Sequence, residues 1–339
     1  MKILSNYINN IKRIAFSSFC DTCITICIIS LISICSCLVF RWLFFEADWD
    51  VVIDNFSLFS FGSYPSSQQW RPSLWLFHLL TITAITLFAP KSNLIEKLLP
   101  IFWISIIPSG IYLLSGGLGL LPVASRYWGG LTLTIFLMVC SSAIAFPFGI
   151  ILAIGRQSNL PLIQYLSSIY IDALRAIPLI TILFFGQLLI PLFLPLGFEI
   201  NRVLRAVLAF SLFVSAYVAE DIRGGLQSIP NNQIEAAKTL GLSKFQINKF
   251  IVLPQALTIA LPSLSNQAIG LLQNTSLMAI LGLVELLGIS RSILANPQFI
   301  GRYLEVYVWI AGVYWLICSI MALIARHIEH KMNRAKSNS

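Results

Sequence analysis

Long runs of residues without a charged side chain are the main feature of this sequence. A helix needs about 20 mostly apolar residues to cross the hydrocarbon core of a bilayer. Seven such runs approach or exceed that length, and an eighth is adequate if it is extended back past Arg205 to Val203. The run at 250–284 is too long for one span, and Pro254 and Pro262 favour a helix that begins near Ser265. The sequence therefore predicts an all-α, polytopic membrane protein with eight spans, at residues 22–40, 72–90, 98–125, 127–155, 176–198, 206–219, 250–284 and 306–325.

The composition excludes several classes of protein. Charged residues make up only 11% of the chain, whereas they are about a quarter of an average soluble domain. The mean hydropathy of +0.83 argues against an ordinary soluble enzyme, a disordered chain and a fibrous repeat. The net charge is +8, but basic residues spread thinly between apolar runs are typical of loops that orient a membrane protein. We expect contacts with membrane lipid and none with nucleic acid.

The basic residues also predict an orientation, because cytoplasmic loops carry an excess of Lys and Arg. Eight spans with the N-terminus inside place 15 of the 22 basic residues in the cytoplasm, among them Lys2, Lys12, Arg13 and Lys91. Seven remain outside, next to an acidic loop at 46–54: Arg41, Arg71, Arg126, Arg202, Arg205, Arg291 and Arg302. Both termini are therefore expected in the cytoplasm.

No arrangement of residues indicates catalysis or cofactor binding. The chain has no Gly-x-x-x-x-Gly-Lys-Ser/Thr phosphate-binding loop, and its three histidines do not form a convincing triad with Ser and Asp. Cys20, Cys23 and Cys27 share a helical face, but Cys in an apolar helix behaves as a small hydrophobe. We expect no enzymatic activity, no metal and no cofactor bound by this chain. An ion channel or ion-coupled carrier would need ionisable residues deep in the spans or inverted repeats, and neither is evident.

A change in composition near residues 115–127 suggests a division of the chain. Gly116, Gly117, Gly119 and Pro122 interrupt the apolar pattern there. We expect an N-terminal extension with three transmembrane helices at 1–121, a five-helix domain at 122–330, and a cytoplasmic tail at 331–339.

The most structured polar segment follows the sixth span, at 220–254. Asn232 and Glu235 have the spacing of a capping box, and Gly241 is a good helix stop. Ser243 and Gln246 repeat the capping-box spacing, and Pro254 is expected to halt the second short helix. A passive connector does not need two separately capped helices, so the pattern favours a docking surface.

This segment resembles the EAA loop of ABC importer permeases. The match consists of Glu-Ala-Ala at 235–237, Gly241, and Ile-Val-Leu-Pro at 251–254. Flanking runs are similar to the branch that takes up polar amino acids: Tyr-Trp-Gly-Gly-Leu-Thr-Leu-Thr at 127–134, Arg-Ala-Ile-Pro-Leu at 175–179, Arg-Gly-Gly-Leu-Gln-Ser-Ile-Pro at 223–230 and Asn-Thr-Ser-Leu at 274–277. The N-terminal helices are similar to those of one subunit of general L-amino-acid transporters. The resemblance assigns ATPase coupling to Glu235, Ala236, Ala237, Gly241, Leu242 and Pro254.

The resemblance implies the ABC importer permease fold with a five-helix core, and a set of partners. A homologous second permease subunit would supply the other half of the pathway. A dimer of cytoplasmic ABC ATPase subunits would hold ATP and Mg and dock on the loop. An external binding protein would deliver L-amino acids, polar or of a broad range. The location implied is the inner (plasma) membrane of a bacterium.

Two further groups of residues are candidates for transport itself. Polar side chains in the seventh span could line the pathway, or they could only hydrogen-bond between helices; they are Gln267, Gln273, Asn274, Thr275 and Ser276. Family members often carry a Lys and an acidic residue where this chain has Gln273 and Asn274, so charge-dependent recognition is not assumed here. Asp172 and Arg175, beside Pro178, form either a surface ion pair that fixes helix depth or part of a gate.

Overall fold

The computed structural model describes residues 15, 17–88, 93–195, 197 and 199–337. They form two compact units, and the boundary along the chain lies between Val51 and Val52. Four basic residues that were predicted to be cytoplasmic lie outside the described residues: Lys2, Lys12, Arg13 and Lys91. Parts of the predicted spans at 72–90 and 176–198 and the last two residues of the tail also lie outside them.

The first unit consists mainly of helix α2 (Phe19–Arg41), which contains the first predicted span. The side chain of Ser18 accepts a hydrogen bond from the backbone N–H of Asp21 and so caps the helix. Asp21 lies in the first turn and Arg41 in the last, where their charges complement the helix dipole. The helix continues as a π-helical turn, Trp42–Glu46. Arg41, the residue before this turn, pairs with Glu46 at its end at 2.8 Å.

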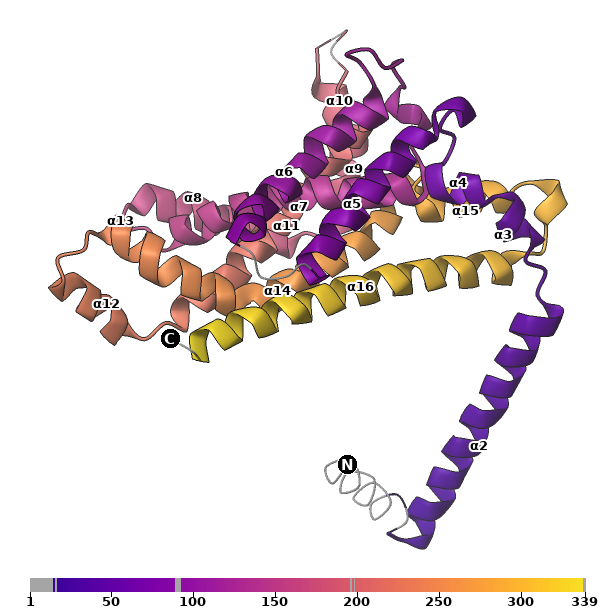
Figure 1. Cartoon of the computed structure of the whole chain (residues 1–339), viewed down its shortest axis with the longest axis horizontal. Helices are drawn as coiled ribbons and strands as arrows, with labels where there is room; N and C mark the ends of the chain where they lie inside the picture. The colour runs from indigo at the N-terminus through magenta and orange to yellow at the C-terminus, as the bar shows by residue number, and fades with distance from the viewer. Residues whose placement is uncertain (1–14, 16, 89–92, 196, 198, 338–339) are drawn as a thin grey trace. The chain divides into compact units, whose positions relative to one another are not determined.

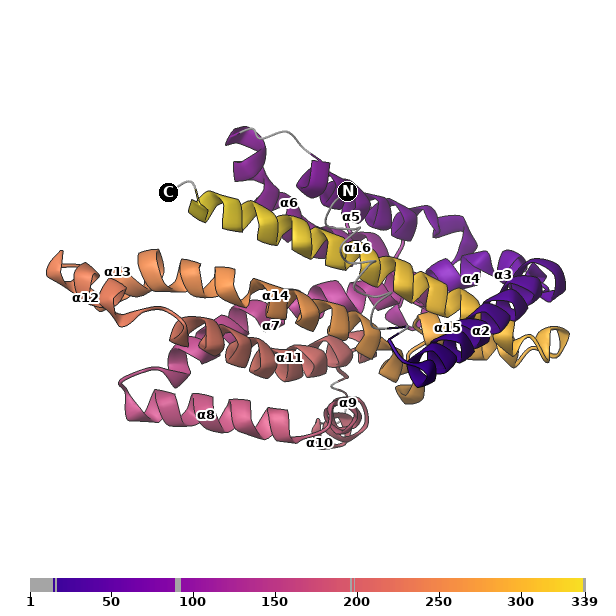
Figure 2. The ribbon, with the colours of Figure 1, turned by 90° about the horizontal axis from the view of Figure 1, so that it is seen from below.

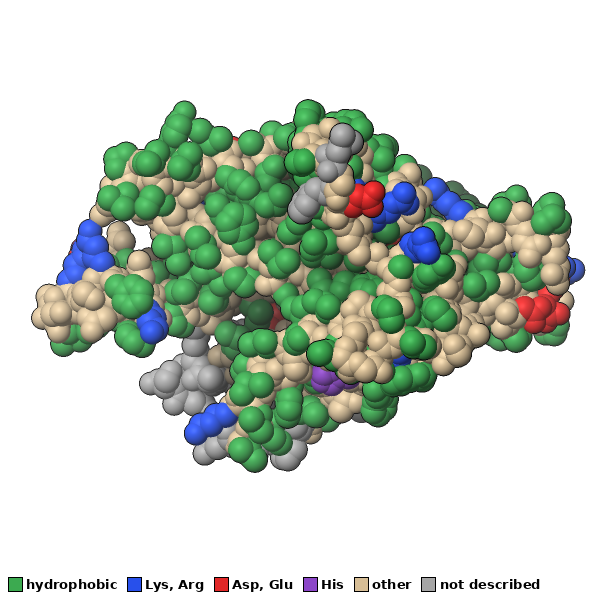
Figure 3. Space-filling model, turned by 90° about the horizontal axis from the view of Figure 1, so that it is seen from above, with side chains coloured by type: hydrophobic (Ala, Val, Ile, Leu, Met, Phe, Trp, Pro, Cys, Tyr) green, Lys and Arg blue, Asp and Glu red, His purple; other side chains and the backbone are tan. Residues whose placement is uncertain are grey.

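The second unit is a bundle of helices (Figures 1 and 2). In chain order after α3 (Asp50–Asp54), its α-helices are α4 (Phe56–Phe61), α5 (Trp70–Phe88), α6 (Asn93–Ser115), α7 (Gly130–Arg156), α8 (Pro161–Ala176), α9 (Leu179–Phe184), α10 (Ile190–Phe193), α11 (Arg202–Gln227), α12 (Asn231–Thr239), α13 (Lys244–Ile247), α14 (Leu253–Asn274), α15 (Leu286–Leu294) and α16 (Tyr303–Ser337). Hydrophobic side chains cover much of the face drawn in Figure 3, as expected of helices that face lipid.

The span prediction is confirmed in number and corrected in three places, the first being the third span, which ends at Ser115 and not at 125. Among the described residues, seven helices are long and apolar enough to cross a membrane, and one bent pair brings the number to eight. The predicted fifth span at 176–198 is instead this pair, Pro161–Ala176 and Leu179–Phe193, bent by 103°. The bend falls at Ile177 and Pro178, because a residue before proline avoids the helical conformation.

The seventh span also begins earlier than predicted. A continuous helical segment runs from Lys244 to Leu281, and Ser265 lies well inside it. Pro262 is accommodated within α14. The predicted start of this helix near Ser265 is therefore wrong.

The core of the second unit is the contact between α7 and α11, which run parallel. Small residues allow their backbones to approach closely. The hydroxyl of Ser141 donates to the carbonyl of Val207, and that of Ser211 donates to the carbonyl of Ser141, both at 3.3 Å. About two turns after Ser141, a Cβ added to Gly149 would lie 2.4 Å from Cγ1 of Val218. The two helices thus interlock with no room for a further methyl group.

Helix α14 packs along α11 in the antiparallel direction and also contacts α7. A Cβ at Gly225 would lie 2.4 Å from the carbonyl oxygen of Ala256. Helices α5 and α6 pair separately, because Trp75 donates from its indole nitrogen to the carbonyl of Ile106 at 2.9 Å. Buried Arg71 binds the carbonyl oxygens of Leu113 (2.6 Å) and Leu121 (2.9 Å). The guanidinium of Arg71 thereby satisfies carbonyl groups at and beyond the end of α6.

The packing at Gly149 predicts a difference between two otherwise equivalent substitutions. Gly149→Ala should destabilise the protein by about 1–3 kcal/mol, because the added methyl overpacks the α7–α11 contact. Gly270→Ala, in α14 with nothing within 4 Å of the new Cβ, should be neutral or stabilising, since alanine favours helix over glycine. Thermal unfolding of both variants in detergent measures this difference. Equal midpoints would contradict the described contact.

Candidate functional site

The α12–α13 segment contains the predicted coupling residues, and one of its predicted caps is wrong. Helix α12 begins at Asn231 with Pro230 as its N-cap, without a side-chain capping bond. The carbonyl of Pro230 accepts from the N–H of Gln233 at 3.2 Å, so the helix starts before Asn232. Proline favours this position because its fixed φ suits a helix entry. Glu235 consequently lies beyond the first turn, and no capping box joins it to Asn232.

The helix stop at Gly241 and the second capping box are confirmed. Gly241 has φ +76°, a conformation that residues with a side chain rarely adopt. Its N–H donates to the carbonyl of Lys238 (2.9 Å), and the N–H of Leu242 donates to the carbonyl of Ala237 (3.3 Å), which ends α12. Ser243 and Gln246 form the expected reciprocal capping box at the start of α13.

Pro254 does not halt the second helix, contrary to the prediction. Helix α13 passes through a π-helical turn, Asn248–Val252, directly into α14, and Pro254 occupies the first turn of α14. The N–H of Leu253 bonds the carbonyl of Asn248, five residues back. A π-turn changes the local hydrogen-bond pattern, so the missing N–H of a proline can be placed there without ending the helix.

A small apolar cluster holds the segment together. It consists of Ile229, Ala237, Ile247, Val252 and Ala256, all buried. Within the Glu-Ala-Ala triplet only Ala237 points into this cluster, and Glu235 and Ala236 are exposed.

The outer surface of the segment carries large apolar and basic side chains. Leu240 and Phe245 are 79% and 72% exposed, and Lys238, Lys244 and Lys249 are also exposed. Exposed apolar side chains ringed by charges are typical of a protein–protein interaction site. The segment thus offers a surface suited to a partner with apolar recesses and acidic groups.

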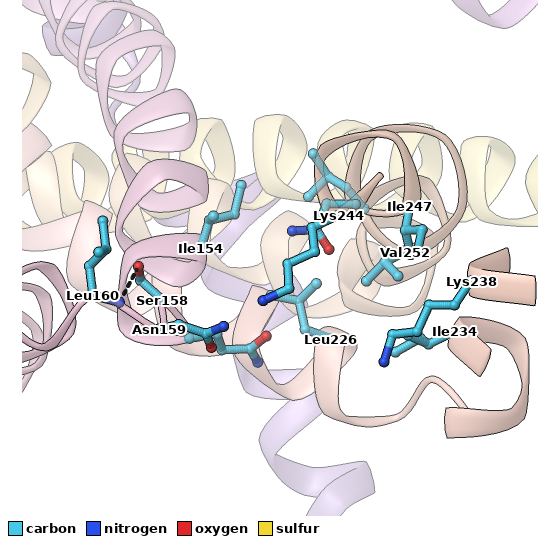
Figure 4. A pocket seen from close by; sticks show the side chains of 13 residues that line it. Ile154, Ser158, Asn159, Leu160, Leu226, Ile234, Lys238, Lys244, Ile247 and Val252 are labelled. Atoms are coloured by element: carbon cyan, nitrogen blue, oxygen red, sulfur yellow. Dashed lines mark hydrogen bonds between the residues drawn. The ribbon is translucent and has the colours of Figure 1, made fainter. Parts of the chain in front are cut away.

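A hollow of about 610 Å³ separates the α12–α13 segment from the loop at residues 157–160. Figure 4 shows Lys238 and Lys244 on the side formed by the segment, with Ser158 and Asn159 on the α7–α8 side. Leu226, near the end of α11, contributes to its apolar lining. The hollow is an opening beside the candidate docking surface that a side chain of a partner can enter.

Asp172 and Arg175 do not form the predicted ion pair with each other; each binds a charged residue of another helix. Asp172 binds Arg156 through two bonds of 2.9 and 3.3 Å. Arg175 lies 3.6 Å from a carboxylate oxygen of Glu220. Pro178 forms the N-cap of α9, at the bend described above. Sequence spacing found the two charged residues but not the helices to which they bind.

The five predicted pathway residues differ in burial and in hydrogen-bond partners. Gln267 donates to a carboxylate oxygen of Asp221 at 3.1 Å. Gln273 is exposed, Asn274 is half-buried, and Thr275 is fully buried. Ser276 donates its hydroxyl to the carbonyl of Gln273 at 2.7 Å. Gln273 therefore has the most exposed amide side chain of the three, and Asn274 and Gln267 are both half-buried.

A buried carboxylate that the sequence analysis did not single out lies near these residues. Glu285 is fully buried and caps α15, since it accepts from the N–H groups of Leu287 (3.0 Å) and Gly288 (2.9 Å). The hydroxyl of Tyr314 in α16 donates to it at 3.2 Å, and that of Thr134 in α7 lies 3.4 Å away. The sequence signal that could have identified Glu285 is that it is a single acidic residue directly after the long apolar run at 250–284. Glu285 thus joins α7, α15 and α16.

Substitution of Glu285 tests this role. Glu285→Leu removes both the cap and the acceptor for Tyr314, and should cost about 2–4 kcal/mol of stability because buried polar partners are left unpaired. Glu285→Gln keeps an acceptor oxygen and should cost about half as much. The thermal midpoints of the purified variants in detergent measure the difference. Equal losses for Leu and Gln would show that the hydrogen bonds do not stabilise this junction.

Comparison with known proteins gives consistent matches. Residues 145–334 match the family described as "Binding-protein-dependent transport system inner membrane component". The inner membrane amino-acid ABC transporter permease protein YhdY of Escherichia coli is 38% identical over 299 residues, which is 86% of this chain and 79% of that protein. The glutamate/glutamine/aspartate/asparagine transport system permease protein BztC of Rhodobacter capsulatus is 32% identical, over 85% of this chain and 79% of its own.

A solved structure agrees. The crystal structure of an amino acid ABC transporter with histidines is similar with a TM-score of 0.54 and 28% identity, over 60% of this chain and 92% of that chain. The family match covers more than half of the chain, and YhdY matches most of both sequences. This chain belongs to the family of binding-protein-dependent transport system inner membrane components, the membrane-embedded permease subunits of ABC transporters.

Proposed function

We propose that this chain is the transmembrane permease subunit of an ABC importer that carries L-amino acids, polar or of a broad range. The observation that carries the proposal is the α12–α13 segment, a pair of short helices divided at Gly241, with exposed apolar and basic side chains at one end of the spans. The relatives named above are amino-acid ABC transporter permeases, which supports the substrate class. ATP hydrolysis belongs to a separate subunit.

The α12–α13 segment is the proposed coupling element. Ala237 anchors it to the apolar cluster, and Gly241 with Leu242 makes the turn between its helices. Glu235 and Ala236 are exposed for contact with an ATPase subunit, and Pro254 starts the helix that leads away from it. A dimer of cytoplasmic ABC ATPases would bind ATP and Mg and dock on this surface.

The remaining parts of the proposal concern assembly and orientation. A second, homologous permease subunit would complete the pathway, and an external binding protein would deliver the substrate. The α12–α13 segment and both termini would face the cytoplasm of a bacterium, with this chain in the inner membrane. We also propose a division into an extension at 1–121, a five-helix domain at 122–330 and a tail at 331–339, which is supported by a family match that begins only at residue 145.

The proposed mechanism is alternating access. Nucleotide binding by the ATPase pair would stabilise one conformation of the permease pair over the other, and the difference in binding free energy would drive the change. Asn274 and Gln273 would face the pathway, with Ser276 nearby, and would hydrogen-bond the ammonium or carboxylate group of the amino acid. Gln267 and Thr275 already have partners within the protein, Asp221 and the carbonyl of Leu272, which favours a supporting role.

The geometry at Gly241 gives a direct test of coupling. Gly241→Val forces a β-branched residue into positive φ and should disrupt the turn. Gly241→Asn, a residue that tolerates this conformation, should be much milder. Glu235→Arg reverses a charge on the exposed face without altering a cap. We expect Gly241→Val and Glu235→Arg to reduce co-purification of the ATPase subunit and amino-acid uptake together. Normal docking and uptake in both would remove the main support for coupling through this segment.

A second prediction concerns the pathway. Asn274→Leu removes a half-buried amide near the end of α14 and should weaken uptake about tenfold, as expected when a polar contact with the substrate is lost. Co-purification of the ATPase and basal ATP hydrolysis should be unchanged. Asn266→Leu, an exposed amide two turns earlier, is the matched control. Unaltered uptake kinetics and selectivity in Asn274→Leu would show that Asn274 only packs between helices.

A further inference from the structure

Two adjacent carboxylates in α11 bind different neighbouring helices. Glu220 is the meeting point of three arginines. Arg223, in the same helix, binds it with Nε at 2.9 Å and through a second, shorter contact from Nη2. Arg156, the last residue of α7, and Arg175, in the last turn of α8, lie 3.5 and 3.6 Å from Oε2 of Glu220. A single carboxylate therefore holds α7, α8 and α11 together.

Asp221 binds α14 instead. Adjacent residues of a helix point about 100° apart, so its side chain faces a different neighbour. The hydroxyl of Ser263 donates to Oδ1 of Asp221, and the amide of Gln267 donates to Oδ2, both at 3.1 Å. Gln267, a predicted pathway residue, is thus committed to a contact between α11 and α14.

These contacts lie at the base of the α12–α13 segment. The segment is attached to the bundle by two helices, α11 before it and α14 after it. Glu220 and Asp221 precede α12 by about three helical turns, and Ser263 follows the π-turn by a similar length of α14. Arg156 directly precedes the loop at 157–160, which lines the hollow beside the segment. The two helices that attach the segment, α11 and α14, are therefore bound to their neighbours at a similar distance from it.

Most of the charged side chains in this cluster are partly shielded from solvent, so their mutual attraction should contribute measurably to stability. The side chains of Glu220, Arg156 and Arg223 are 20%, 24% and 29% exposed, and Asp172 is the one other acid bound to these arginines among the described residues. Fully exposed ion pairs contribute little. Here, removal of the charge of Glu220 would leave Arg156, Arg223 and the more exposed Arg175 (38%) with a single carboxylate, and like charges close together disfavour one another.

We propose that Glu220 and Asp221 are positioning residues that bind the α12–α13 segment rigidly to α7, α8 and α14, so that displacement of the segment by its partner moves these helices together. This inference rests on the proposed function. It assigns the two carboxylates to the transmission of movement, and neither to ATPase docking nor to recognition of the amino acid.

The test measures how much amino acid is moved per ATP hydrolysed. The complete transporter, with its partner permease and ATPase subunits, is reconstituted in vesicles with its binding protein and a labelled mixture of L-amino acids. Glu220→Gln removes one charge and keeps the shape of the side chain. Gln267→Met removes only the amide that binds Asp221, which keeps the test open if Glu220→Gln does not fold. Glu329→Gln, the same change in α16, is the matched control.

We expect Glu220→Gln and Gln267→Met to retain ATPase co-purification and ATP hydrolysis, but to move about tenfold less amino acid per ATP. Glu329→Gln should match the wild type. An unchanged ratio in both variants would overturn the inference, and so would loss of ATPase co-purification, because the residues would then only shape the docking surface. A change of amino-acid selectivity in Gln267→Met would assign Gln267 to the pathway instead. Failure of the wild-type ATPase to bind would refute the proposed function itself.

Discussion

The close contact between α7 and α11 is the constraint on which the second unit depends. Gly149 lies directly against Val218, and the hydroxyls of Ser141 and Ser211 bond carbonyl groups across the same contact. In a bilayer, lipid is as apolar as the helix surfaces, so such packing and hydrogen bonding provide the attraction that burial provides in water. Helices α8 and α14 attach to this pair through Glu220 and Asp221, and α15 attaches to α7 through Glu285.

Polar groups stabilise this protein mainly at the ends of its helices. Arg71 satisfies carbonyl groups at and after the end of α6, Glu285 satisfies the first N–H groups of α15, and Gly241 closes the end of α12. Unpaired backbone groups cost most where water is scarce, so the contacts of Arg71 help to fix the end of a span, and those of Glu285 and Gly241 fix ends of the shorter helices α15 and α12. The α12–α13 segment lies at one end of the spans and has its own apolar cluster, so it presents a distinct surface there.

The sequence predicted features that depend on a few neighbouring residues. The stop at Gly241 and the capping box of Ser243 and Gln246 follow from local chemistry, and both are present. The cap at Asn232 was wrong because Pro230 starts the helix earlier, and the stop at Pro254 was wrong because a π-turn admits the proline. The partners of Asp172 and Arg175, and the hydroxyls of Thr134 and Tyr314 that contact Glu285, lie on other helices. Spacing along one helix cannot reveal them, since they depend on which helices pack together.

The central claim is that the outer face of the α12–α13 segment contacts the ATPase subunit. Cross-linking from single cysteines in a Cys-free background, within the assembled transporter, tests it directly. Position 245, where Phe245 is 72% exposed, should cross-link to the ATPase, and position 247, where Ile247 is 4% exposed in the apolar cluster, should not. Absence of a cross-link from position 245 in a complex that hydrolyses ATP and transports amino acids would contradict the account.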